Sequence, residues 1–116
     1  MDAQLQQALE FSNYRQTLAI QRKTLKERID SKLTYGYNGG IFKIDRSLIT
    51  FTQMMLDQGR TSGVPILDSN DNPILITDVE KFRDEILDRY FTSTLEYYES
   101  YEKLKKSRTV EKLVDL

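Results

Sequence analysis

The sequence predicts a mainly α fold with a small β component (α+β), in which two long antiparallel helices are joined by a head of two β-hairpins and one short helix. Two long segments lack glycine and proline and repeat apolar residues every three or four positions. The segment between them is punctuated by glycine, proline and asparagine-glycine turns. A chain of 116 residues, 39% hydrophobic and 30% charged, suits a single domain over residues 1–116.

The first long helix is predicted over residues 2–33. Its apolar residues recur mostly at three- to four-residue steps and form a narrow stripe with a polar middle: Leu5, Leu9, Phe11, Leu18, Leu25, Ile29 and Leu33. Arg15 and Arg22 interrupt the heptad pattern of this stripe. We therefore expect this helix to pair as in a coiled coil, without entering a deep core.

Residues 34–77 are predicted to form the head, beginning with a hairpin. Asn38-Gly39 lies between β-favouring segments and indicates a type I′ turn. Asp45 or Ser47 is then expected to cap a short helix through Leu48–Leu56. Because this helix is apolar on most sides, we expect it to be buried.

The second half of the head is predicted from one glycine and two apolar segments. Gly59 is expected to end the short helix in a left-handed conformation. Residues 64–67 and 73–76 flank a polar turn and predict a second hairpin. Pro65 and Pro73 have no amide hydrogen, so each requires a strand start or an edge.

The second long helix is predicted over residues 78–107, followed by a C-terminal tail over 108–116. Thr77 and Glu80 match a capping box, with Thr77 as the N-cap. Apolar and aromatic residues then cover a wide face. They comprise one stripe of Val79, Phe82, Ile86, Tyr90, Tyr97, Tyr101 and Leu104, and a second of Leu87, Phe91, Leu95 and Tyr98.

Composition argues against an enzyme. The chain has no cysteine and no histidine, which removes thiolate chemistry, the usual zinc ligands and the usual general base. We assign no catalytic, cofactor-binding or metal-binding residue and expect no cofactor. A carboxylate enzyme using Asp84, Glu85 and Asp88 is a minor alternative to a solvated helix face.

The net charge and the hydropathy of the chain argue against general binding to nucleic acid or to membranes. Seventeen basic and eighteen acidic residues give a net charge of -1, so no overall field attracts nucleic acid or a membrane. No apolar run is long enough to cross a bilayer, and the N-terminus lacks the pattern of a signal peptide. We expect no membrane association and a cytoplasmic protein.

Two turn sequences weakly match ligand-binding loops. Asp68, Asn70 and Asn72 fit the first positions of a calcium loop, but Pro73 stands where glycine is required. A polar hairpin turn is the favoured interpretation. The glycines at 36–40 favour a hairpin turn over a phosphate loop, since no P-loop lysine follows.

A surplus of apolar surface at the C-terminal end predicts partner binding. The tyrosines keep a polar hydroxyl beside a large ring, as a half-exposed seam or subunit interface requires. The tail is expected either to fold back on the head or to dock on another subunit or partner. The candidate partner-binding residues are Tyr90, Tyr97, Tyr98, Tyr101, Val110, Leu113, Val114 and Leu116.

A nucleic-acid accessory function is the alternative for the same end of the chain. Lys103, Lys105, Lys106 and Arg108 concentrate positive charge beside tyrosines that resemble stacking platforms. Cations also stabilise the C-terminus of a helix through its dipole, so a structural role explains them equally simply.

Three segments carry a resemblance to a known family. They are Leu33-Thr34-Tyr35-Gly36-Tyr37-Asn38-Gly39-Gly40-Ile41-Phe42-Lys43, Ile66-Leu67-Asp68 before Pro73-Ile74, and Tyr101-Glu102-Lys103-Leu104-Lys105-Lys106-Ser107-Arg108. In these segments the chain resembles small proteins of T-even-like tailed phages of marine cyanobacteria. The resemblance implies a phage protein that acts in particle structure or assembly, or as an adaptor, in the host cytoplasm or incorporated in the virion.

The predicted order of elements, a long helix, then hairpins, then a second long helix, also resembles that of prefoldin-type chaperone subunits. The short helix at Leu48–Leu56 departs from that plan. Together, these patterns predict a non-enzymatic interaction protein that forms a homo-oligomer or binds other phage proteins. Nucleic-acid binding and a prefoldin-like chaperone role are the alternatives.

Overall fold

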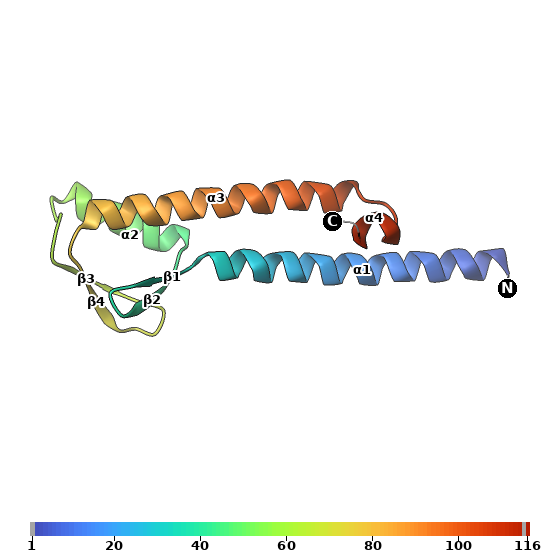
Figure 1. Ribbon diagram of the computed structural model, residues 1–116, viewed down its shortest axis with the longest axis horizontal. Coiled ribbons are helices and arrows are strands. Elements are labelled where there is room, and N and C mark those ends of the chain that lie inside the picture. Colours follow the sequence, from blue (N-terminus) through green and yellow to red (C-terminus); the bar gives the residue numbers. More distant parts are fainter. Residues whose placement is uncertain (1, 115) are drawn as a thin grey trace. The chain divides into compact units, whose positions relative to one another are not determined.

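A computed structural model describes residues 2–114 and 116 of the chain (Figure 1). The elements follow in the order α1 (Ala3–Lys32), β1 (Thr34–Tyr37), β2 (Gly40–Lys43), α2 (Arg46–Asp57), β3 (Val64–Leu67), β4 (Pro73–Ile76), α3 (Val79–Lys106) and α4 (Val110–Val114). The predicted mainly helical α+β fold, with two long helices and two antiparallel hairpins, is confirmed.

The chain divides into two compact units. We call Met1–Ile29 with Leu95–Leu116 the helical unit, and Asp30–Thr94 the head unit. Helices α1 and α3 each contribute residues to both units. That residues 1–116 form a single domain stays a prediction.

The start of α3 differs from the predicted capping box. Asp78, not Thr77, is the N-cap, because its carboxylate accepts a hydrogen bond from the Lys81 amide at 3.0 Å. Aspartate and threonine are both good caps, so spacing alone could not choose between them. A long-range contact fixes the entry of the helix: the Val79 amide donates to the Thr61 carbonyl at 3.0 Å.

The first hairpin has the predicted turn. Strands β1 and β2 pair antiparallel from Thr34↔Lys43 to Tyr37↔Gly40. The two turn residues have positive φ, 47° at Asn38 and 83° at Gly39, as a type I′ turn requires. The asparagine-glycine pair therefore sets the strand register locally.

Helix α2 has both predicted ends. The Asp45 carboxylate accepts from the Leu48 amide at 2.8 Å, so Asp45 and not Ser47 is the cap. At the other end Gly59 has a φ of 78°, and the amides of Gly59 and Arg60 donate to the carbonyls of Leu56 and Met55. This is a Schellman motif, which satisfies carbonyls that the last turn leaves without partners.

The expected burial of α2 is wrong. Thr52 is its buried residue, and the Thr52 hydroxyl donates to the Leu48 carbonyl at 2.8 Å. Phe51 and Met54 are exposed. Since only one side of the helix meets the rest of the head unit, the apolar residues on its other side remain in contact with water.

The second hairpin also forms as predicted, with Val64↔Ile76 and Leu67↔Pro73 at its ends. The sheet has two strands, so both are edges and tolerate Pro65 and Pro73. The two hairpins approach closely at Gly40. A Cβ atom there would lie 2.5 Å from Ile74 Cγ1, so only glycine fits without displacement.

The core of the head unit surrounds Phe82 on the first turns of α3. Its ring packs edge-on against Tyr37 and Phe42, with centroids 5.2 and 5.3 Å away, and stacks near Tyr35 at 6.1 Å. Edge-to-face and offset pairs of this kind add to the stabilisation from burial. Other large side chains that are fully buried in this unit are those of Ile44, Thr52, Ile76, Val79 and Ile86.

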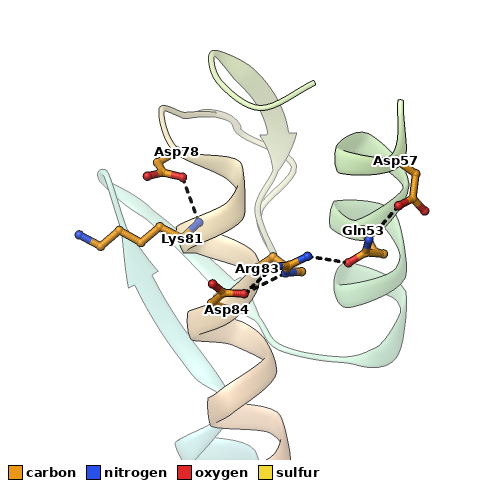
Figure 2. Close-up of polar contacts among 6 residues, drawn as sticks. All are labelled: Gln53, Asp57, Asp78, Lys81, Arg83 and Asp84. Carbon is orange, nitrogen blue, oxygen red and sulfur yellow. Dashed lines mark hydrogen bonds and ion pairs between the residues drawn. The ribbon is translucent and has the colours of Figure 1, made fainter. Parts of the chain in front are cut away.

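Polar contacts join α2 to the start of α3 in the same unit (Figure 2). Arg83 donates to the Gln53 side chain at 3.1 Å and binds the Asp84 carboxylate at 2.8 Å. Gln53 in turn donates to Asp57 at 2.9 Å. These bonds orient α2 along one side of α3 without burying its outer face.

Candidate interaction surface

Within the helical unit, three contacts define an antiparallel pairing of α1 with the last turns of α3. The Tyr14 hydroxyl donates to the Ser107 carbonyl at 2.8 Å. Arg28, the residue before the end of the unit's first segment, lies 3.6 Å from the Glu96 carboxylate and 3.4 Å from the Ser100 hydroxyl. Low numbers on α1 thus meet high numbers on α3.

The C-terminal tail folds back within the helical unit. The Gln21 side chain donates to the Leu113 carbonyl at 3.3 Å, and the Leu113 side chain is 0% exposed. Thr109 caps α4 by accepting from the Lys112 amide at 3.2 Å. The described contacts of the tail are within the helical unit. That the tail folds back on the head or docks on another subunit or partner stays a prediction.

The predicted partner-binding residues do not share one environment. Leu113 is fully buried, whereas Val114 is 63% exposed and Leu116 is also exposed. Tyr98 and Tyr101 are exposed, and Tyr97 and Val110 are half-buried. Tyr90, also half-buried, belongs to the head unit. The structure therefore leaves Tyr98, Tyr101, Val114 and Leu116 most accessible to a partner.

The basic residues of the alternative function lie at the exposed end of α3. Lys103, Lys105, Lys106 and Arg108 are all exposed. The first three stand in the last turn of the helix, where a positive charge interacts favourably with the helix dipole. Acidic Glu99, Glu102 and Glu111 flank them along the chain.

Part of the apolar stripe predicted for the first helix is exposed, together with Ile20, which sequence reasoning left out. Leu5, Leu9, Phe11 and Ile20 are all exposed, and every residue from 3 to 13 is exposed. Leu5, Leu9 and Ile20 lie off the heptad that contains Phe11, Leu18 and Leu25, and this spacing is the signal for a second face. A helix with apolar residues on a second face has more apolar surface than one partner can cover.

The turn at Asp68 is structural. Its carboxylate accepts three backbone amides, from Ile41 at 3.0 Å and from Asn70 and Asn72 at 2.9 Å each. The Ser69 amide and hydroxyl both donate to the Ile41 carbonyl. The loop therefore binds the edge of β2, and the hydrogen bonds from Ile41 and Asn72 lower the pKa of Asp68.

These bonds agree with a polar hairpin turn and leave few lone pairs for calcium. Among the residues that the structure describes, no group of three or more histidine, cysteine, aspartate or glutamate side chains is arranged to hold a metal ion.

A second pair of contacts holds Tyr35 on the first hairpin. The Arg89 guanidinium lies over the Tyr35 ring at 4.4 Å and pairs with the Glu85 carboxylate at 2.7 Å. Burial raises the pKa of the Tyr35 hydroxyl, nearby Glu85 raises it further, and Arg89 opposes both. Tyr35 is thus a neutral packing residue at physiological pH.

The head unit has an apolar groove beside α2. It encloses about 390 Å³ and includes Phe42, Leu48, Phe51, Ile66 and Leu67 among its lining residues. Phe51 and Leu67 remain exposed at this groove. Its other lining residues are polar or charged: Lys43, Asp45, Ser47, Asp68 and Ser69.

Comparison with protein-family models, with curated proteins and with solved structures finds no match to the chain. Among the described residues, no helix is both long and apolar enough to span a membrane. The exposed residues of the two units are therefore the basis for a proposed function.

Proposed function

We propose that this chain is a non-enzymatic interaction protein that self-associates through its helical unit. The observation that carries the proposal is the apolar surface that this unit leaves in water. Leu5, Leu9, Ile20, Leu95 and Tyr98 are exposed large hydrophobic residues, all within Met1–Ile29 and Leu95–Leu116. Extended exposed apolar surface marks interaction sites in soluble proteins.

The uncovered start of α1 supports the same proposal. The Tyr14–Ser107 hydrogen bond lies close to the end of α3, and residues 3–13 precede it with every side chain exposed. A helical segment of about a dozen residues is only marginally stable in water when nothing packs against it. Association would supply the missing packing.

The test is absolute molar mass by light scattering coupled to size exclusion, over a dilution series at protein concentrations from about 1 to 100 μM. We expect a multimer of the 13.6 kDa chain that dissociates on dilution or persists throughout. A monomer at every concentration overturns the proposal.

The phage resemblance suggests where such an interaction protein would act. We propose a structural or assembly component of a phage particle, present in the host cytoplasm or incorporated in the virion. Mass spectrometry of purified particles distinguishes the two roles, since a structural component is present at a fixed copy number and an assembly factor is absent. Failure to detect the chain in particles or in assembly intermediates contradicts both roles.

Nucleic-acid binding is the second candidate. The exposed Lys103, Lys105, Lys106 and Arg108, with exposed Tyr98 and Tyr101 in the same unit, favour it. Such a site would bind a fluorescent single strand with an affinity that falls as salt rises. Replacing the four basic residues with glutamate should then abolish binding, and absence of binding by the unmodified chain at low salt dismisses the function.

A further inference from the structure

One face of α1 is exposed and free of charge over more than four turns. Leu5, Leu9, Ser12, Gln16 and Ile20 follow one another at steps of three or four residues, which places them on one side of the helix. Leu5, Leu9 and Ile20 are 52%, 47% and 65% exposed, and Ser12 and Gln16 are also exposed. We call these five residues the N-terminal strip.

The N-terminal strip lies away from the packed side of the same helix. Within the helical unit, the buried residues of α1 are Leu25 and Ile29, and Leu18 is half-buried on the same side. Leu18 is nine residues from Leu9 and two from Ile20, spacings that put it roughly half a turn away from both. The strip is therefore a second apolar face of α1. Gln16 and Ile20, toward its C-terminal end, also border a cavity that Thr109 and Val110 of the tail line.

The two ends of the N-terminal strip carry charges of opposite sign. Asp2 and Lys23 continue the three- and four-residue spacing at its two ends, and both are exposed. Lys23 also lies 4.0 Å from Glu27 one turn further on, in an exposed pair that leaves the Lys23 ammonium accessible. A parallel pairing of two strips would place like charges together at each end. An antiparallel pairing would place Asp2 of each copy near Lys23 of the other, Leu5 near Ile20, and Leu9 near Gln16. Charge complementarity therefore selects a second copy in the antiparallel direction.

We infer that the N-terminal strip pairs antiparallel with the same strip of a second copy, with Ser12 of each copy at the centre. This rests on the proposed self-association and names the surface that performs it. Ala8 and Ala19, both exposed, flank the strip and would let the two helices approach closely. A two-fold axis near Ser12 makes the interface closed, so the expected product is a dimer.

Cysteine cross-linking tests the direction, since the chain has no native cysteine. Under mild oxidation Ser12→Cys should give a disulfide-linked dimer. Leu5→Cys alone should not, whereas Leu5→Cys mixed with Ile20→Cys should give a linked heterodimer. Glu10→Cys, an exposed position on another side of α1, is the control and should stay unlinked. Efficient self-linking of Leu5→Cys would overturn the antiparallel arrangement.

A second measurement separates this inference from the proposed function. The double variant Leu9→Gln/Ile20→Gln changes exposed residues, so circular dichroism should show an intact fold, and the dimer dissociation constant should rise at least tenfold. The control Glu10→Gln should leave the dimer dissociation constant unchanged. If the chain still self-associates with an unchanged constant in the double variant, the strip pairing is refuted while self-association stands. A monomeric unmodified chain refutes both.

Discussion

The head unit and the helical unit use their apolar residues differently. In the head unit, residues from both hairpins, α2 and α3 converge, and Phe42, Ile44, Ile76, Phe82 and Ile86 are almost completely buried. In the helical unit the buried hydrophobic residues are Leu25, Ile29, Leu104 and Leu113. Both units leave large hydrophobic residues in water, for example Phe51 and Phe91 in the head unit and Leu5 and Ile20 in the helical unit. The difference is that the head unit buries a larger set of apolar residues around Phe82.

This difference in packing indicates which unit contributes most to stability and which to association. A compact mixture of strands and helices surrounds a residue such as Phe82 on several sides. Paired helices can cover only the faces turned toward each other, and additional apolar faces need further partners. We therefore expect core substitutions in the head unit to reduce stability and surface substitutions in the helical unit to reduce association.

The largest expected effect is that of Phe82→Ala. Phe82 is 1% exposed and contacts three aromatic rings, so its truncation should lower the free energy of unfolding by about 3–5 kcal/mol. Phe91→Ala is the matched control on the same helix and in the same unit, because Phe91 is 66% exposed. Its effect should stay within about 0.5 kcal/mol. Urea denaturation followed by circular dichroism compares the two, and equal losses would contradict the assignment of the core.

A smaller effect is expected for Leu113→Ala in the helical unit. Leu113 is fully buried but belongs to a helix of 5 residues, so its loss should release α4 locally at a cost of about 2 kcal/mol. Hydrogen exchange should become faster at the amides of α4 while the head unit keeps its protection. Val114→Ala changes the exposed neighbour and serves as the control. Unaltered exchange in Leu113→Ala would show that α4 does not depend on this contact.

The smallest expected effect is a change in stability at acidic pH, and it tests whether the Asp68 carboxylate stabilises the turn. Hydrogen bonds from backbone amides lower the pKa of Asp68 below its ordinary value of 3.8 in the folded chain. The stability that these bonds contribute is therefore complete above pH 3.8 and is lost as the pH falls through the lower, folded pKa.

Asp68→Asn should remove this part of the acid dependence, because an amide does not titrate in that range. Asp71→Asn, in the same turn, is the control. Thermal unfolding measured between about pH 2 and pH 6 should show a shallower decline for Asp68→Asn than for the unmodified chain and the control. Parallel curves for all three chains would mean that the Asp68 carboxylate has no special role.

Local sequence determined the elements and their turns. The Asn38-Gly39 pair set the first hairpin, Asp45 and Gly59 set the two ends of α2, and the two segments without glycine or proline became α1 and α3. These features depend on backbone conformations and hydrogen bonds within a few residues, which a sequence displays directly.

Tertiary structure alone decided which side chains are covered. Sequence placed Leu113 and Val114 in one candidate set, yet the fold buries the first and exposes the second. The fold likewise leaves one side of α2 exposed and makes Asp78 the N-cap of α3. In the folded chain the Asp68 carboxylate accepts hydrogen bonds from three backbone amides. Burial and long-range hydrogen bonds depend on residues far apart in the chain, and for that reason periodicity predicted the helices but not their covered faces.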